Sequence, residues 1–315
     1  MKILHITPKK FLSATKNEKS RLGNQVQAIN ITLLKKQPHG IVFFGIPSDQ
    51  GIRNVGGRLG AAKAPDTIRS KLYHFTSKKF SFPIYDFGNL IIPSSIEETH
   101  AGAAEAISLI RRAGHLPIIL GGGHDLAYPE ALSLLQNEKN PCGFLNIDAH
   151  LDLRNTEHGI TSGSPWYLLL QNPLFKKQKC SLIEFGIQSH CNVDTLFEYA
   201  KNKKVEIHSL DKVISSPVQS FQKTLSKLTN KKKSILVSLD IDSARSSDAP
   251  GCSAPQVRGF SAENIIQMSK LAGKHGKVRS FGIYEVSPPL DQDNRSSTLA
   301  AHCILQFLEG FEMRK

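Results

Sequence analysis

The chain has 315 residues, of which 40% are hydrophobic, and its formal net charge is +13, from 40 lysines and arginines against 27 aspartates and glutamates. This length suits one large α/β domain or two smaller ones, and no apolar stretch approaches the ~20 residues needed to cross a bilayer, so we predict no membrane span. The basic residues cluster at predicted loops without interleaved aromatic residues, which favours a solvated surface over nucleic-acid binding. The five cysteines form no C-x-x-C pair, so we expect a reducing, cytoplasmic setting.

In chain order, apolar runs of strand length alternate with helical patterns almost throughout. Strands are predicted at 40–46, 84–90, 117–120, 143–152, 181–187, 205–210, 234–242 and 278–286. Helices are predicted at 65–73, 95–113, 126–135, 193–199, 218–228, 262–275 and 297–311, and a loop of about a dozen residues is predicted after the strand at 143–152. Continuous apolar strands separated by helices predict a mostly parallel sheet that is covered on both faces. We find no repeat and no linker, and therefore predict a single catalytic domain over 1–315, in which the more polar residues 1–38 form an N-terminal arm.

Three short acidic stretches each lie at the end of an apolar run. They are Gly122-Gly123-His124-Asp125, Asp148-Ala149-His150-Leu151-Asp152 and Asp240-Ile241-Asp242. Alternate side chains of an extended strand point to the same face, so Asp148, His150 and Asp152 are expected to project together. Asp240 and Asp242 repeat this spacing, and a glycine-bearing loop would add a histidine. The carboxyl ends of parallel strands meet at one edge of the sheet, which is where the ligand pocket of such a sheet lies.

The number of carboxylates in these stretches predicts bound metal. Burying so many charges costs several kcal/mol per ion unless something neutralises them. Four aspartates and two neutral histidines would balance the charge of two divalent cations, and oxygen-rich ligands suit Mn²⁺ better than a metal that prefers thiolates. The alternative is that these residues only cap turns, but caps do not require paired carboxylates beside histidine. We therefore predict a dinuclear metal hydrolase.

The order of the three motifs resembles that of a known family. From Gly45 to Phe311, the chain is similar to the ureohydrolases, which comprise arginases, agmatinases and formimidoylglutamases. The resemblance implies a three-layer α/β/α sandwich, two Mn²⁺ ions per subunit and assembly into a homo-oligomer. It also implies that the metal ligands are His124, Asp148, His150, Asp152, Asp240 and Asp242.

Other stretches resemble the formimidoylglutamase branch of this family. Residues 45–61 are similar to its N-terminal loop, residues 249–255 to its A-P-G-x-S-A-P loop, and residues 285–295 to its closing segment. The stretch 161–166 is not followed by the histidine that arginases carry, and 186–192 lacks the carboxylate that arginases use for the substrate α-amino group. The resemblance thus implies hydrolysis of N-formimidoyl-L-glutamate to L-glutamate and formamide, a step of histidine degradation.

This chemistry assigns a role to each candidate residue. Two cations that share a water can lower its pKa enough to give hydroxide near neutral pH, and the hydroxide then attacks the formimino carbon. Asp152 would accept a hydrogen bond from this nucleophile and pass its proton to the leaving nitrogen, while Glu285 would pair with the amidinium N–H groups. An anionic substrate needs hydrogen-bond donors at its carboxylates. The candidates are Arg58, Arg154, Ser162 and Asn192, with Arg245 and Arg258 held in reserve.

Three other functions remain open. Hydrolysis of another amidine or guanidine, such as arginine, agmatine or a guanidino acid, would use the same metal site, although the missing carboxylate argues against arginine and the basic loops argue against agmatine. A non-catalytic metal-binding scaffold or a deacetylase-like binding protein is disfavoured because all six ligands and Glu285 are present. Nucleic-acid binding through net charge would be revealed by a salt-titrated gel shift.

Overall fold

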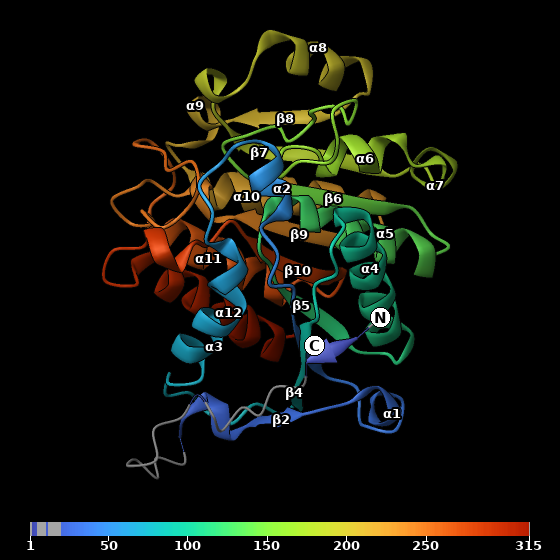
Figure 1. The fold of residues 1–315 in the computed structure, drawn as a ribbon, viewed down its shortest axis with the longest axis vertical. Coiled ribbons are helices and arrows are strands. Elements are labelled where there is room, and N and C mark those ends of the chain that lie inside the picture. Colours follow the sequence, from blue (N-terminus) through green and yellow to red (C-terminus); the bar gives the residue numbers. More distant parts are fainter. Residues whose placement is uncertain (1, 5–10, 12–19, 315) are drawn as a thin grey trace.

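The computed structural model describes residues 2–4, 11 and 20–314 (Figure 1). The strands are β1 Ile3–Leu4, β2 Val26–Ala28, β3 Ile41–Gly45, β4 Ile84–Leu90, β5 Leu116–Leu120, β6 Cys142–Ile147, β7 Ser181–Ile187, β8 Glu206–Ser209, β9 Ser234–Asp240 and β10 Val278–Tyr284. The α-helices are α1 Ile31–Leu34, α2 Gln50–Asn54, α3 Ala64–Leu72, α4 Ile96–Arg112, α5 Ala127–Asn137, α6 Pro165–Gln171, α7 Pro173–Lys177, α8 Asp194–Asn202, α9 Leu210–Val213, α10 Pro217–Lys231, α11 Ala262–Lys274 and α12 Arg295–Glu312.

Within the described residues, the strands form one ten-stranded sheet. The order is β1-β4-β3-β5-β10-β9-β6-β7-β8, and β2 also pairs with β4. β1 runs antiparallel to β4, and the other strand pairs are parallel, which confirms the predicted mostly parallel sheet. Of the predicted N-terminal arm, β1 and β2 pair with β4, while 5–10 and 12–19 lie outside the described residues.

Both faces of the sheet are buried under helices, because successive strand residues point to opposite sides. Along β6, Phe144 packs into one apolar cluster and Leu145 into the other. Helices α3, α10, α11 and α12 cover the face of Leu145, and α4, α5 and α6 cover the face of Phe144 (Figure 1). This arrangement confirms the predicted three-layer α/β/α sandwich.

The connection between β6 and β7 contains two helices that were not predicted. A loop follows β6 as expected, and the short helices α6 and α7 lie beyond it, in a stretch for which the sequence predicted no element. Each begins with a proline in its first turn, a position where the missing N–H is not needed. The buried Trp166 anchors α6, and the Asn172 side chain caps α7 by accepting the Leu174 N–H at 3.0 Å. Such helices are too short to leave a clear helical period in the sequence.

The helices of the sandwich are the lengths expected for packing onto a sheet. The longest is α12, with 18 residues, and it buries its apolar side against α3 and α11. In the described part of the chain, we find no helix that combines the length and the apolar character needed to cross a membrane.

Candidate metal centre

The two ligand-bearing segments at the sheet edge leave it through tight turns. β6 ends at Ile147, and Oδ1 of Asp148 accepts the backbone N–H of His150 at 2.7 Å. β9 ends at Asp240, whose Oδ1 accepts the backbone N–H of Asp242 at 2.8 Å. An aspartate that bonds the backbone two residues further on bends the chain. The predicted extension of strands 143–152 and 234–242 through their ligands is therefore wrong, although the side chains still converge.

One group of ligand atoms gathers around His124. Its Nδ1 lies 3.0 Å from Oδ2 of Asp148 and 2.9 Å from Oδ2 of Asp152. Oδ2 of Asp240 lies 3.0 Å from the same nitrogen. The Nε2 atom lies 2.9 Å from the Oγ of Ser238, whereas Nδ1 is buried without a hydrogen-bond partner. A ring nitrogen that faces three carboxylates while its opposite nitrogen is held by a second group is the usual arrangement of a metal-ligating histidine.

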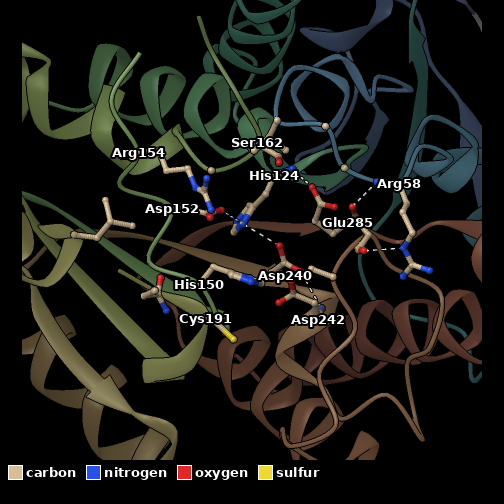
Figure 2. Close-up of a pocket in the computed structure, with 18 of the residues that line it drawn as sticks. Arg58, His124, His150, Asp152, Arg154, Ser162, Cys191, Asp240, Asp242 and Glu285 are labelled. Atoms are coloured by element: carbon tan, nitrogen blue, oxygen red, sulfur yellow. Dashed lines mark hydrogen bonds and ion pairs between the residues drawn. The ribbon is translucent and has the colours of Figure 1, made fainter. Parts of the chain in front are cut away.

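A second group lies beside the first. Nδ1 of His150 is 3.0 Å from Oδ2 of Asp242 and 3.5 Å from Oδ1 of Asp148. Asp148 thus belongs to both groups, and the ligand atoms within each group all lie within 4.8 Å of one another. The structure brings all six predicted metal ligands together, as two adjacent groups that share one aspartate and could each hold a cation. Figure 2 shows two histidines and three of the aspartates converging on the floor of a pocket.

The electrostatics of the cluster fit two divalent cations. Burial, followed by the charges of Asp242 and Asp148, raises the pKa of Asp240 well above its ordinary value. Burial and the charge of Asp148 likewise raise the pKa of Asp152 to about 6. Carboxylates that penalise each other's charge in this way are relieved by bound cations. The four carboxylates and two imidazoles are donors that suit Mn²⁺.

Glu285 lies next to this cluster, just after β10. It is 6% exposed, and its Oε1 accepts the backbone N–H of His124 at 2.8 Å. Its φ of 63° is in the left-handed region, which is strained for a residue other than glycine and is typical of functional sites. Burial raises the pKa of Glu285 to about 8. Asp152 has a φ of 48°, so two of the predicted catalytic residues share this unusual backbone conformation.

A pocket of about 470 Å³ opens above the cluster, and all four predicted substrate-binding residues line it. Arg154 and Ser162 both come from the segment that follows β6. Arg58 lies on the opposite side, where its guanidinium donates to the Ser253 carbonyl at 3.0 Å and to the Cys252 carbonyl at 2.8 Å (Figure 2). Those bonds tie Arg58 to the loop over 249–255.

The two arginines held in reserve do not line this pocket. Arg245 donates to Asp248 at 3.0 Å, and Arg258 donates to Asp211 at 2.8 Å. Both arginine side chains are at least half exposed to solvent. Their positions are those of surface ion pairs.

The Asn192 amide is occupied by backbone groups. Its Nδ2 donates to the carbonyls of Ala149 at 3.1 Å and Gln188 at 2.8 Å, and its Oδ1 accepts the Leu151 N–H at 2.8 Å. Asn192 therefore clamps the segment that carries Asp148, His150 and Asp152 to the loop after β7.

Some residues of the site were not predicted from the sequence. Cys191 lines the pocket, and Val193 and Leu196 form an apolar wall. Ser238, which contacts His124, could have been found, because it lies two residues before Asp240 on one strand and therefore points to the same face. No comparable periodic pattern in the sequence identifies Val193 and Leu196 as pocket residues.

Comparisons with known proteins agree with this geometry. A model of the arginase family matches residues 39–309. Formimidoylglutamase of Staphylococcus carnosus (strain TM300) is 29% identical over 286 residues, which cover 90% of each chain. The crystal structure of formimidoylglutamase from Bacillus subtilis subsp. subtilis str. 168 has a TM-score of 0.87 and 26% identity, covering 96% of this chain and 95% of that one. Trypanosoma cruzi formiminoglutamase, solved with Mn²⁺, has a TM-score of 0.81 and 27% identity, covering 99% and 100%. The chain belongs to the arginase family.

Proposed function

We propose that this chain hydrolyses N-formimidoyl-L-glutamate to L-glutamate and formamide, with two manganese ions per subunit. One observation carries the proposal: six side chains that could hold metal lie together, and all of them except the buried Asp148 line a pocket whose wall includes Arg154. A cationic wall suits a substrate with two carboxylates. The relatives named formimidoylglutamase, one of them solved with Mn²⁺, support the same substrate and metal.

The metal ligands and Asp152 have different roles in the proposed reaction. Two divalent cations, when bound by the two ligand groups, would supply a water of lowered pKa as the nucleophile. Asp152 lines the pocket and is placed to accept a proton from that water and to pass it to the leaving nitrogen. Its φ of 48° is in the left-handed region, a strained conformation that clusters at functional sites.

Glu285 orients the reacting carbon. Its Oε1 is held by the His124 N–H, and we assign its second oxygen to the N–H groups of the substrate amidinium. A charge-assisted pair of this kind is stronger than a neutral hydrogen bond and places the carbon over the nucleophile.

The substrate carboxylates contact the wall of the pocket in this proposal. Arg154 and Ser162 are the donors assigned to them, since neither side chain is engaged as Arg58 and Asn192 are. Arg58 positions the 249–255 loop, and Asn192 positions the ligand-bearing segment after β6.

A substrate panel tests the proposal. Manganese-loaded protein is incubated with N-formimidoyl-L-glutamate, L-arginine, agmatine and 4-guanidinobutyrate, and formamide, glutamate and urea are measured. Formamide and glutamate in equal amounts, with the highest kcat/KM for the formimino compound, are expected. Higher kcat/KM for a guanidine substrate would instead assign the chain to guanidino-compound hydrolysis, and bound manganese without turnover would favour a scaffold.

The remaining features of the proposal concern the cellular setting. We infer that the chain is a single catalytic domain that acts in the cytoplasm, in histidine degradation, as a homo-oligomer. The free cysteines support a reducing compartment. Light scattering coupled to gel filtration measures the assembly, and a monomer at micromolar concentration would contradict it.

A further inference from the structure

A buried carboxyl group lies behind the metal-ligand cluster without belonging to it. Glu184 on β7 is the register partner of Asn146 on β6, and both side chains are completely buried. Nδ2 of Asn146 donates to Oε2 of Glu184 at 2.9 Å and also to Oδ2 of Asp148 at 3.1 Å. A single amide therefore links Glu184 to the aspartate that both cation sites share.

The second oxygen of the carboxyl group and the amide oxygen both lack a hydrogen-bond donor. Oδ1 of Asn146 and Oε1 of Glu184 are both buried without a partner. Each unsatisfied buried acceptor carries a free-energy cost, and two acceptors cannot bond each other. One proton on Oε1 of Glu184 removes both costs. The acid O–H then donates to Oδ1 while the amide N–H donates to Oε2, so the two groups join in a ring of two hydrogen bonds.

The surroundings of Glu184 favour that proton. Burial raises the pKa of Glu184 well above its ordinary value, and the charges of Asp148 and Asp152 raise it further. An ionised Glu184 would add a further negative charge beside the four aspartates, whose charges two divalent cations would balance. A neutral acid leaves this balance unchanged.

We propose that Glu184 is a protonated, uncharged positioning residue, which locks the Asn146 amide so that its N–H points at Asp148. The acid accepts from the amide N–H and donates to the amide oxygen, which fixes the orientation of an otherwise nearly symmetrical group. Oδ2 of Asp148 thereby accepts the Asn146 amide N–H, while Oδ1 accepts the backbone N–H of His150. The shared ligand is clamped at both oxygens before any cation binds. This inference rests on the metal centre of the proposed function and deepens it.

Manganese affinity in two variants tests the clamp. Glu184→Gln can rebuild the ring with an amide, and its manganese affinity, measured by calorimetry or by the electron paramagnetic resonance of free Mn²⁺, is expected to stay within twofold of the parent. Glu184→Leu removes the ring and is expected to weaken binding about 10–100-fold, the usual effect of losing a group that orients a metal ligand. Equal affinity of Glu184→Leu and the parent overturns the proposal. A tenfold weaker Glu184→Gln also overturns it, because that result would mean that the parent carries a charge at this position.

Infrared spectroscopy provides a readout that holds even if Glu184→Leu fails to fold. The difference spectrum of parent minus Glu184→Gln at neutral pH is expected to contain the carbonyl band of a protonated carboxylic acid. A carboxylate band in its place overturns the proposal. Neither measurement requires turnover, so a failure of the substrate panel leaves the state of Glu184 to be decided separately.

Discussion

Glu285 accepts a hydrogen bond from the backbone N–H of His124 across 2.8 Å, although 161 residues separate the two in the chain. The bond joins the end of β10 to the loop after β5, and these two strands are neighbours in the sheet. A metal ligand and the carboxylate assigned to the substrate are therefore held in one rigid frame. In the proposed function, this frame would set the position of the substrate relative to the cations.

The carboxylate of Glu285 is tested by Glu285→Gln. We expect kcat/KM for N-formimidoyl-L-glutamate to fall about 100-fold, because a charge-assisted pair with the amidinium becomes a neutral one. The manganese content should remain that of the parent, since Glu285 contacts His124 only through its backbone. Steady-state kinetics and metal analysis check the two parts. Full turnover in this variant would exclude Glu285 from substrate binding.

The second cation site is tested by His150→Ala. The variant should fold, because the His150 side chain is 23% exposed, but it should bind one manganese ion fewer per subunit and lose activity. Metal analysis after gel filtration and circular dichroism measure these properties. His158→Ala is the matched control, because His158 is exposed in the loop after the same segment and should behave like the parent. A His150→Ala variant with both ions would contradict the assignment.

The substrate carboxylates are tested by Arg154→Met. Loss of a charged hydrogen-bond donor worth about 1.5–3 kcal/mol should raise KM roughly 10–100-fold with a smaller effect on kcat. Arg258→Met serves as control, because Arg258 pairs with Asp211 outside the pocket and should keep the parent KM. Equal KM values for the two variants would remove Arg154 from the substrate site.

A buried ion pair joins Arg69 of α3 to Asp86 of β4. Nε and Nη2 of Arg69 donate to the two oxygens of Asp86 at 2.8 and 2.9 Å, and both side chains are completely buried. Arg69→Met should lower the free energy of unfolding by about 3–5 kcal/mol, because it leaves the Asp86 charge uncompensated. Lys270→Met, at a half-exposed pair with Glu309, should change it by less than about 1 kcal/mol. Urea unfolding of both variants measures the difference, and equal midpoints would contradict this account.

The raised pKa of the buried Glu130 should make the free energy of unfolding depend on pH. Tyr284 donates to its Oε2 at 2.5 Å, yet burial raises the pKa of Glu130 from 4.5 to about 7. A carboxyl group that binds its proton more tightly in the folded state stabilises the fold below pH 4.5, and this contribution is lost as the pH rises to 7. Relative to Glu130→Gln, the parent should therefore lose about 3 kcal/mol of unfolding free energy across this range. Urea titrations at several pH values measure it, and parallel curves for the two proteins would refute it.

The sequence predicted well the features that depend on local order. Buried strands and long helices leave a period in the chain, so the layers of the sandwich could be read from it. The ligand types were equally visible, because His124, His150 and the four aspartates are chemically suited to metal whatever the backbone shape. Helices α6 and α7 were missed, since each is too short to establish a period.

By itself, the amino-acid sequence determined which side chains can hold the metals and that they gather at the carboxyl ends of the strands. Tertiary structure alone decided how they meet. The turns at Asp148 and Asp240 replace extended strands, Arg58 is engaged by the 252–253 backbone, and Glu184 reaches Asn146 across 38 residues of chain. The physical reason is that such contacts join residues far apart in the chain, and their geometry follows from the packing of whole elements rather than from any local pattern.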